Sequence, residues 1–134
     1  MTALHRFETG FDAANIDKVK AAVSASLAQA GIHDPLAYSV LTIVDEVCCN
    51  IFEHSQASWV EVELRSQPER LHLVVRDNGL AFDPTQQANL RRDAPPEEAA
   101  ERKLGLYMMG KLSERCHYLR LGGLHNELSF EIKR

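Results

Sequence analysis

The segment from Trp59 to Arg76 constrains the fold most strongly, because apolar and polar residues alternate along it in two runs separated by a short turn. Such alternation is typical of a strand with one buried face. The turn, Gln67–Arg70, contains a proline and is short enough to join antiparallel neighbours. The segment therefore predicts a hairpin whose apolar face is covered by other elements. The residues expected on that face are Val60, Val62, Leu64, Leu71, Leu73 and Val75.

Two helices are expected before this hairpin. Apolar residues recur every three or four positions from Asp12 to Ala30, and Gly31 is a typical stop signal. Asp34-Pro35 then predicts a new helix with Asp34 as its N-cap, and helical spacing continues to about Ser55. The other expected elements are a first strand at Leu4–Thr9, a helix at Leu106–Leu112, and a final hairpin made of Cys116–Leu121 and Glu127–Lys133.

The order of these elements predicts an α+β fold, a two-layer α/β sandwich with one mixed sheet and the helices on one face. A doubly wound parallel sheet would need regular alternation of strands and helices, which the chain lacks. Pro84 to Lys103 is polar, contains Pro95-Pro96 and shows no strong period, so we expect a long loop there. Long loops in compact domains are usually functional, for example as lids.

Size and charge exclude several classes of protein. The 134 residues are enough for a single domain, 1–134, and the hydrophobic and charged fractions of 45% and 25% exclude a wholly disordered chain. A net charge of −4 without a basic stripe argues against direct nucleic acid binding. No apolar run approaches the ~20 residues of a membrane-spanning helix. The three cysteines form neither a disulfide framework nor a CxxC motif, so we expect a cytoplasmic protein in which Cys48 and Cys49 fill the core.

Glu46, Asn50 and His54 are spaced four residues apart on the second expected helix. Each step of four turns by only about 40°, so the three side chains share one stripe beside the apolar face. A solvated helix edge is the simpler interpretation for any one of them. A metal–phosphate site is the alternative, because Mg²⁺ prefers oxygen ligands and takes few of them from protein. A glutamate one turn away can hold a water molecule, or it can accept the proton of an attacking hydroxyl.

The loop after the second strand of the hairpin, Asp77 to Pro84, is longer than a simple turn requires. Asp77 stands at the strand end, where its carboxylate can accept a hydrogen bond from an exocyclic amino group such as that of adenine. Gly79 permits close approach of a flat ring. Gly105 opens the third helix, where backbone amides attract phosphate. The simpler alternatives are an ordinary Asp-Asn-Gly turn and a glycine at a loop–helix junction.

The order and spacing of these motifs resemble the N, G1 and G2 boxes of the GHKL ATP-binding superfamily, which has the Bergerat fold. The matching runs are Glu46-x3-Asn50-x3-His54, Asp77-x-Gly79-x2-Phe82-Asp83-Pro84 and Leu104-Gly105-Leu106-x-Met108-Met109. The resemblance extends from about Asp34 to the end of the chain. Within the superfamily the chain looks most like the stand-alone anti-sigma factor serine/threonine kinases of bacteria.

The resemblance implies ATP and Mg²⁺ as cofactors and assigns roles to individual residues. By resemblance, Glu46 is the general base, Asn50 is the Mg²⁺ ligand, and His54 shapes the site. Asp77 binds the adenine amino group and Gly79 packs beside the ring. A lid of about residues 84–104 closes over the triphosphate. The remaining residues that the boxes and lid offer to the nucleotide are Ala81, Phe82, Arg91, Arg92, Arg102, Lys103, Leu104, Gly105 and Leu106.

Two positions depart from the family pattern. The family usually has glycine where Ala81 stands, and one methyl is tolerated there if φ is negative. The family also usually has Gly-x-Gly-Leu where this chain has Lys103-Leu104-Gly105-Leu106. Lys103 can supply a phosphate charge, or it can impede lid closure and weaken ATP binding.

The resemblance implies an ATP-binding anti-sigma regulatory kinase, one that phosphorylates a Ser or Thr of a STAS-type antagonist and sequesters a sigma factor. The first strand and helix would form a homodimer surface. The alternative is a nucleotide-binding or degenerate protein that acts only by binding partners. A histidine-kinase catalytic domain fits less well, because no helical phosphoacceptor segment is visible in the chain.

Overall fold

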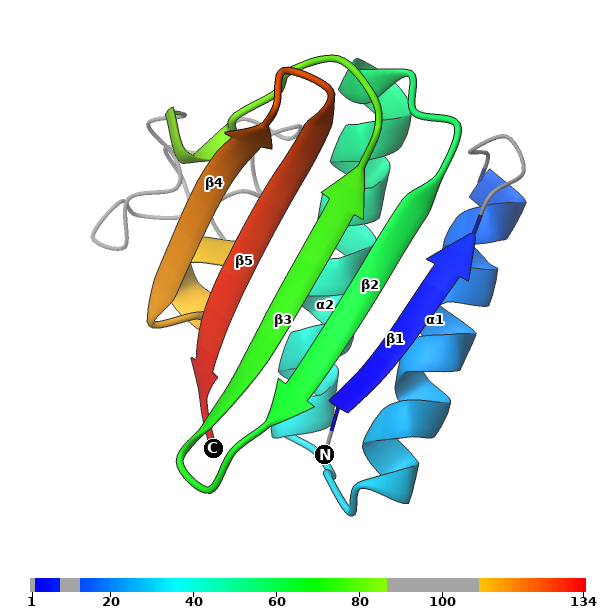
Figure 1. Cartoon of the computed structure of the whole chain (residues 1–134). Coiled ribbons are helices and arrows are strands. Elements are labelled where there is room, and N and C mark those ends of the chain that lie inside the picture. The colour runs from blue at the N-terminus through cyan, green and yellow to red at the C-terminus, as the bar shows by residue number, and fades with distance from the viewer. Residues whose placement is uncertain (1, 8–12, 87–108) are drawn as a thin grey trace, which may run out of the picture.

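The computed structural model describes residues 2–7, 13–86 and 109–134. Five strands form one sheet, and the helices lie together on one of its faces (Figure 1). The elements are β1 (Thr2–Phe7), α1 (Ala13–Gln29), α2 (Leu36–Asn50), a π-helical turn η1 (Ile51–Ser55), β2 (Val60–Ser66), β3 (Arg70–Asp77), a 3₁₀ turn η2 (Pro84–Gln86), β4 (Arg115–Leu121) and β5 (His125–Lys133). Residues 109–112 are also helical. The α+β sandwich predicted from the sequence is therefore confirmed.

The strand order is β1-β2-β3-β5-β4, and all four neighbouring pairs are antiparallel. The prediction of a mixed sheet was wrong in this detail. Strands β3 and β4 run in the same direction, but β5 lies between them and pairs with both, so they never pair with each other. Both predicted hairpins are confirmed, β2 with β3 and β4 with β5.

The core lies between the helices and the covered face of the sheet. Alternate residues of each central strand point into this core, as the period of two requires. The apolar stripes of α1 and α2 pack onto them with the helical spacing expected from the sequence. Fully or almost fully buried members include Val19, Val23, Leu27, Val40, Ile43, Val44, Val62, Leu64, Leu71, Leu73, Phe130 and Ile132. Cys48 is also fully buried in this cluster and Cys49 packs against it, which confirms their expected place in the core.

The helix ends differ partly from the sequence-based expectation. Gly31 adopts a φ of +70° two residues after α1 ends at Gln29, so its predicted role as a stop is confirmed. The prediction that Asp34 caps α2 was wrong. Pro35 occupies the N-cap without a side-chain hydrogen bond, and the amide of Ala37 instead donates to the carbonyl of His33.

Other boundaries shift by one or two residues, since β1 begins at Thr2 and β5 already begins at His125. Of the expected lid, only Pro84–Gln86 belongs to the described residues, and it forms a short 3₁₀ turn. Of the helix expected at Leu106–Leu112, residues 109–112 are described and helical, whereas 106–108 lie outside the described residues. Within the described residues, no helix is long and apolar enough to cross a membrane.

Candidate functional site

A pocket opens where the C-terminal end of α2 meets the ends of β3 and β5. Its cavity volume is about 20 Å³, or about 310 Å³ when the open space at its mouth is included. Apolar side chains form most of its wall and a few polar groups are set among them, as is typical of small-molecule sites. The apolar residues are Val47, Ile51, Val75, Phe82, Pro84 and Leu128, and the polar ones are Asn50, Ser55, Asp77, Tyr118 and Asn126.

Asp77 is the buried carboxylate of this pocket, with an exposed fraction of only 3%. Its Oδ1 accepts hydrogen bonds from the backbone amide of Gly79 at 2.8 Å and from Nδ2 of Asn126 at 3.1 Å. Within the described parts of the chain, Oδ2 accepts none. Burial raises the pKa of Asp77 above its ordinary value, and the two hydrogen bonds only partly offset this effect. The carboxylate thus keeps one acceptor oxygen for a ligand with an N–H group.

Asn126 and Arg120 hold the Asp77 loop, and the sequence interpretation missed both. Asn126 is buried and also donates to the carbonyl of Leu80 at 2.8 Å. Arg120 donates to the carbonyl of Gly79 at 2.8 Å. A signal for Asn126 was present, since it is in phase with the inward positions of β5, where a polar residue requires a buried partner.

Gly79 is required by close packing. A Cβ at this position would lie 2.2 Å from the carbonyl oxygen of Ser55, and the neighbouring amide of Leu80 donates to that same oxygen at 2.6 Å. No side chain fits at Gly79 unless the loop moves away from η1. The loop after β3 therefore docks tightly on the end of the helical segment that carries Asn50.

The three residues of the expected helix stripe separate in the structure. Asn50 lines the pocket, and its side-chain amide has no hydrogen-bond partner among the described residues. The π-helical turn after Asn50 changes the register, so Ser55 lines the pocket and His54 does not. His54 instead stacks on Phe82, with the ring centroids 4.6 Å apart. Single π-helical turns inside helices are frequent at functional sites.

Glu46 lies one turn before Asn50, outside the pocket lining, and is partly buried. Burial raises the pKa of its carboxyl group, and the negative charges of Asp45 and Glu53 raise it further. Its neighbour Asp45 pairs with Lys20 of α1 at 3.2 Å, whereas Glu46 has no partner among the described residues. A carboxylate with a raised pKa and no partner suits the role of proton acceptor.

The other expected site residues are divided between described and undescribed parts of the chain. Ala81 is exposed, and among the described residues other than glycine only Gln56 has a positive φ, so the methyl group of Ala81 meets no backbone strain. Arg91, Arg92 and the five residues Arg102, Lys103, Leu104, Gly105 and Leu106 lie outside the described residues.

The residues present fit a nucleotide bound with Mg²⁺. Asp77 offers a buried acceptor, and the apolar wall of the pocket suits the faces of a base. Asn50 offers an amide oxygen to a hard cation. Among the described residues, no three His, Cys, Asp or Glu side chains gather closely enough to hold a metal. The ion would therefore take most of its ligands from phosphate and water.

Comparison with known proteins supports the nucleotide part of this interpretation. Residues 10–132 match the profile of the histidine kinase-like ATPase domain. No curated protein matches the chain at a significant level.

Three solved structures share the fold. A chain of the SiaB–SiaC complex from Pseudomonas aeruginosa aligns with a TM-score of 0.66 at 13% identity, covering 96% of this chain and 88% of that one. The structure of the RsbU and RsbW domains of Rv1364c from Mycobacterium tuberculosis aligns with a TM-score of 0.64 at 14% identity, covering 98% of this chain and 33% of that one. The histidine kinase domain of the blue-light activated histidine kinase EL346 from Erythrobacter litoralis aligns with a TM-score of 0.51 at 19% identity, covering 89% of this chain and 59% of that one.

Proposed function

This chain belongs to the histidine kinase-like ATPase domain family, and from that premise we propose that it is an ATP-dependent regulatory protein kinase of the anti-sigma type. It would bind Mg²⁺-ATP, transfer the γ-phosphoryl group to a Ser or Thr of a STAS-type antagonist, and sequester a sigma factor. Family membership implies ATP binding. The kinase activity, the Mg²⁺ ion and the partners are the proposed part.

The observation that carries this proposal is the meeting of Asn50 and Asp77 on one pocket. The two residues come from different motifs, at the end of α2 and the end of β3, and both remain available to a ligand within the described residues. Asp77 Oδ2 would accept a hydrogen bond from the amino group of adenine. Asn50 Oδ1 would ligate Mg²⁺. The bound ion would supply charge neutralisation of the phosphates, as in phosphoryl transfer generally.

Glu46 would accept the proton of the attacking hydroxyl group at its carboxylate. Its raised pKa makes it a stronger base than an exposed glutamate, although it must still be ionised to act. The stack of His54 on Phe82 would hold the loop after β3 against the end of the helix. His54 thereby shapes the site without taking part in proton transfer.

Protein partners are supported by the structural neighbours. One of them was solved as the SiaB–SiaC complex, and another contains an RsbW domain beside an RsbU domain. We propose that this chain likewise acts by binding other proteins in the cytoplasm, including a second copy of itself. A purely binding role is the alternative, since Lys103 replaces a glycine of the phosphate-binding box.

Calorimetric titration tests the nucleotide part of the proposal, with ATP and GTP each measured with Mg²⁺ and with a chelator. We expect Mg²⁺-dependent binding of ATP at sub-millimolar concentration and weaker binding of GTP. Absence of ATP binding would remove the proposal.

Transfer of the γ-phosphoryl group is then assayed with labelled ATP and a panel of purified STAS-domain proteins from the same genome. ATP binding without transfer to any of them would favour the purely binding role.

A further inference from the structure

Arg120 connects three parts of the molecule near the pocket. From the end of β4, its Nη1 donates to the carbonyl of Gly79 at 2.8 Å and to Oδ1 of Asn126 at 3.1 Å. Its Nη2 donates to the carbonyl of Gly123, in the β4–β5 turn, at 2.9 Å. Arginine has only donors and stays charged, so each group that it meets here must be an acceptor.

This requirement fixes the side-chain amide of Asn126. Its Oδ1 accepts from Arg120 and from the hydroxyl of Tyr118, while its Nδ2 donates to Asp77 and to the carbonyl of Leu80. A rotated amide would turn its N–H groups toward Arg120 and its oxygen toward the Asp77 carboxylate. Every one of those contacts would be unfavourable in a buried position.

We propose that Arg120 is a positioning residue for base recognition, which acts by orienting the Asn126 amide so that Asp77 is held through Oδ1 and keeps Oδ2 for the ligand. This inference rests on the proposed nucleotide site. Arg120 contacts the loop and Asn126 and is not itself required to contact the nucleotide. Its bond to Gly79 also fixes the loop that carries the carboxylate.

The charges around Asp77 are consistent with this role. Burial raises the pKa of Asp77, whereas Arg120 from β4 and His125 from β5 act on this pKa in the opposite direction. On the α2 side lies Cys48, whose thiol is neutral because burial raises its pKa to about 12. Arg120 is thus the permanent positive charge that favours the ionised, accepting form of Asp77.

The test compares Arg120→Gln and Arg120→Lys with the matched control Arg115→Gln. Arg115 lies at the other end of the same strand, and its side chain is 82% exposed. Two quantities are measured, namely the affinities for Mg²⁺-ATP and Mg²⁺-GTP across a range of pH, and the pKa of the Asp77 carboxyl group by carbon-13 NMR without nucleotide. Repeating the titration in a His125→Gln background separates the charge of the histidine from that of the arginine.

We expect Arg120→Gln to weaken ATP binding roughly tenfold, to lower the preference for ATP over GTP, and to raise the pKa of Asp77. Arg120→Lys should recover part of each effect, and Arg115→Gln should change none. An unaltered Asp77 pKa together with unaltered base preference would overturn the proposal, even if overall affinity fell. If Arg120→Gln does not fold, Arg120→Lys serves instead, because it keeps the charge but cannot bridge Gly79, Asn126 and Gly123 together, and it should still lower the preference for ATP over GTP. Should the unmodified chain bind no ATP, the proposed function fails, while the NMR titration still tests the link between Arg120 and Asp77.

Discussion

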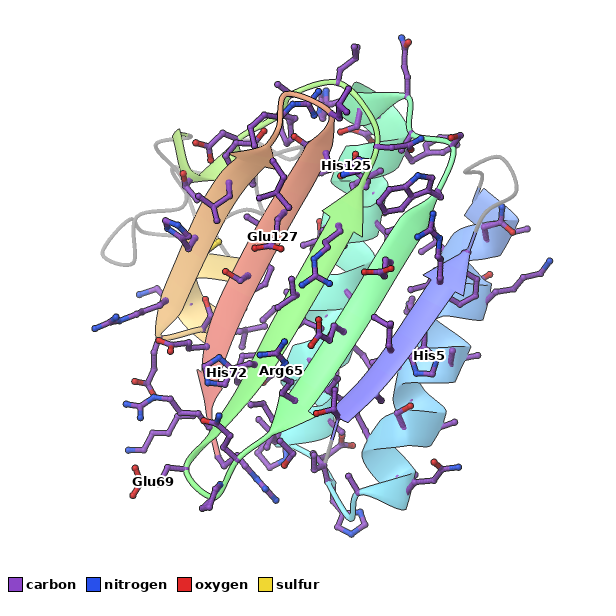
Figure 2. All side chains as sticks on the ribbon, viewed as in Figure 1. His5, Arg65, Glu69, His72, His125 and Glu127 are labelled. Carbon is purple, nitrogen blue, oxygen red and sulfur yellow. The ribbon has the colours of Figure 1, made fainter. Side chains whose placement is uncertain are left out.

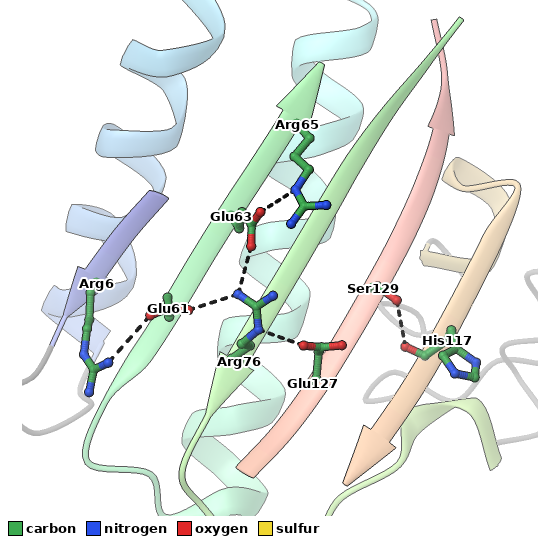
Figure 3. A network of polar contacts seen from close by, with 8 residues as sticks. All are labelled: Arg6, Glu61, Glu63, Arg65, Arg76, His117, Glu127 and Ser129. Carbon is green, nitrogen blue, oxygen red and sulfur yellow. Dashed lines mark hydrogen bonds and ion pairs between the residues drawn. The ribbon is translucent and has the colours of Figure 1, made fainter. Parts of the chain in front are cut away.

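Carboxylates lie on both faces of the sheet, and their surroundings differ. On the open face, Arg76 of β3 bridges Glu61 and Glu63 of β2, each at 3.0 Å, and Glu127 of β5 at 2.7 Å (Figure 3). On the helix-covered side, Glu46 has no partner among the described residues, and Asp77 is bound through one oxygen only.

The pKa of Glu63 on the open face shifts in the opposite direction to those of Glu46 and Asp77. Burial alone would raise the pKa of Glu63, but hydrogen bonds from Arg65 and Arg76 outweigh it, and the pKa falls below its ordinary value. At Glu46 and Asp77 burial dominates and the pKa rises. We therefore expect the ion-paired carboxylates of the open face to stabilise the fold, and Glu46 and Asp77, which form no ion pair among the described residues, to serve the proposed site.

The alternating charges of the open face follow the register of the strands. Arg6, Glu61, Arg76 and Glu127 lie in one row across four strands, so each charge meets an opposite neighbour. Figure 2 shows Glu127, His72 and Arg65 on this uncovered face. An antiparallel sheet with one exposed face requires such a polar surface.

The largest expected effect is on phosphoryl transfer, which should depend on Glu46 but not on a glutamate of the open face. Glu46→Gln should reduce phosphoryl transfer about 10²- to 10⁴-fold while sparing ATP affinity, because only proton acceptance is lost. Transfer is measured with labelled ATP and the partner found in the panel, and Glu61→Gln is the matched control. A normal rate in Glu46→Gln would show that the base is assigned to the wrong residue.

Nucleotide affinity should distinguish the two buried carboxylates, Asp77 beside the pocket and Glu63 on the open face. Asp77→Asn should weaken ATP binding by roughly tenfold to a hundredfold, because an amide offers a weaker acceptor than a carboxylate. Glu63→Gln should leave the affinity unchanged. Calorimetry checks both variants, and equal losses in the two would remove the distinction between the faces.

The free energy of unfolding should depend on the ion pairs of the open face more than on the residues near the pocket. Arg76→Met leaves three carboxylates without their shared cation, so we expect a loss of about 2–4 kcal/mol in the free energy of unfolding with ATP affinity unchanged. Urea denaturation measures the loss, and Arg115→Met serves as an exposed control on the same sheet. A stability loss no larger than that of the control would mean that the network contributes little.

The smallest expected effect is on the pH dependence of stability. The lowered pKa of Glu63 stabilises the fold above its ordinary value of 4.5, and this contribution is lost as the pH falls through the folded-state pKa. The raised pKa of Asp77 acts oppositely, so stability falls as the pH rises from 3.8 through its folded-state pKa. Plots of the urea midpoint against pH should show that Glu63→Gln removes the first trend and Asp77→Asn removes the second. Identical pH profiles for the two variants would contradict the opposite signs.

Much of the fold could be predicted because its signals are local. The alternation in Trp59–Arg76 and the spacing of apolar residues in the two helices each arise within a few residues. The mixed sheet was a wrong prediction because the position of β5 between β3 and β4 depends on pairing between distant segments. The cap at Asp34 was wrong because its side chain competes with a backbone bond from Ala37 to His33.

The candidate site was predicted only in part for the same reason. Asn50, Asp77 and Phe82 were named from motif spacing, and the structure brings them to one pocket. Asn126 and Arg120 were missed because their roles depend on contacts across more than 40 residues of sequence. The roles assigned to Glu46, Asn50 and Asp77 stay predictions until the variants are measured.

By itself, the sequence determined the residue types that a nucleotide site needs and the periodicity that makes one sheet face apolar. Only the tertiary structure decided which polar groups remain without partners. The π-helical turn after Asn50 moved His54 onto Phe82, and Arg120 with Asn126 engaged one oxygen of Asp77. Local sequence fixes backbone periods, but the availability of a buried acceptor depends on every donor that folding brings within reach of it.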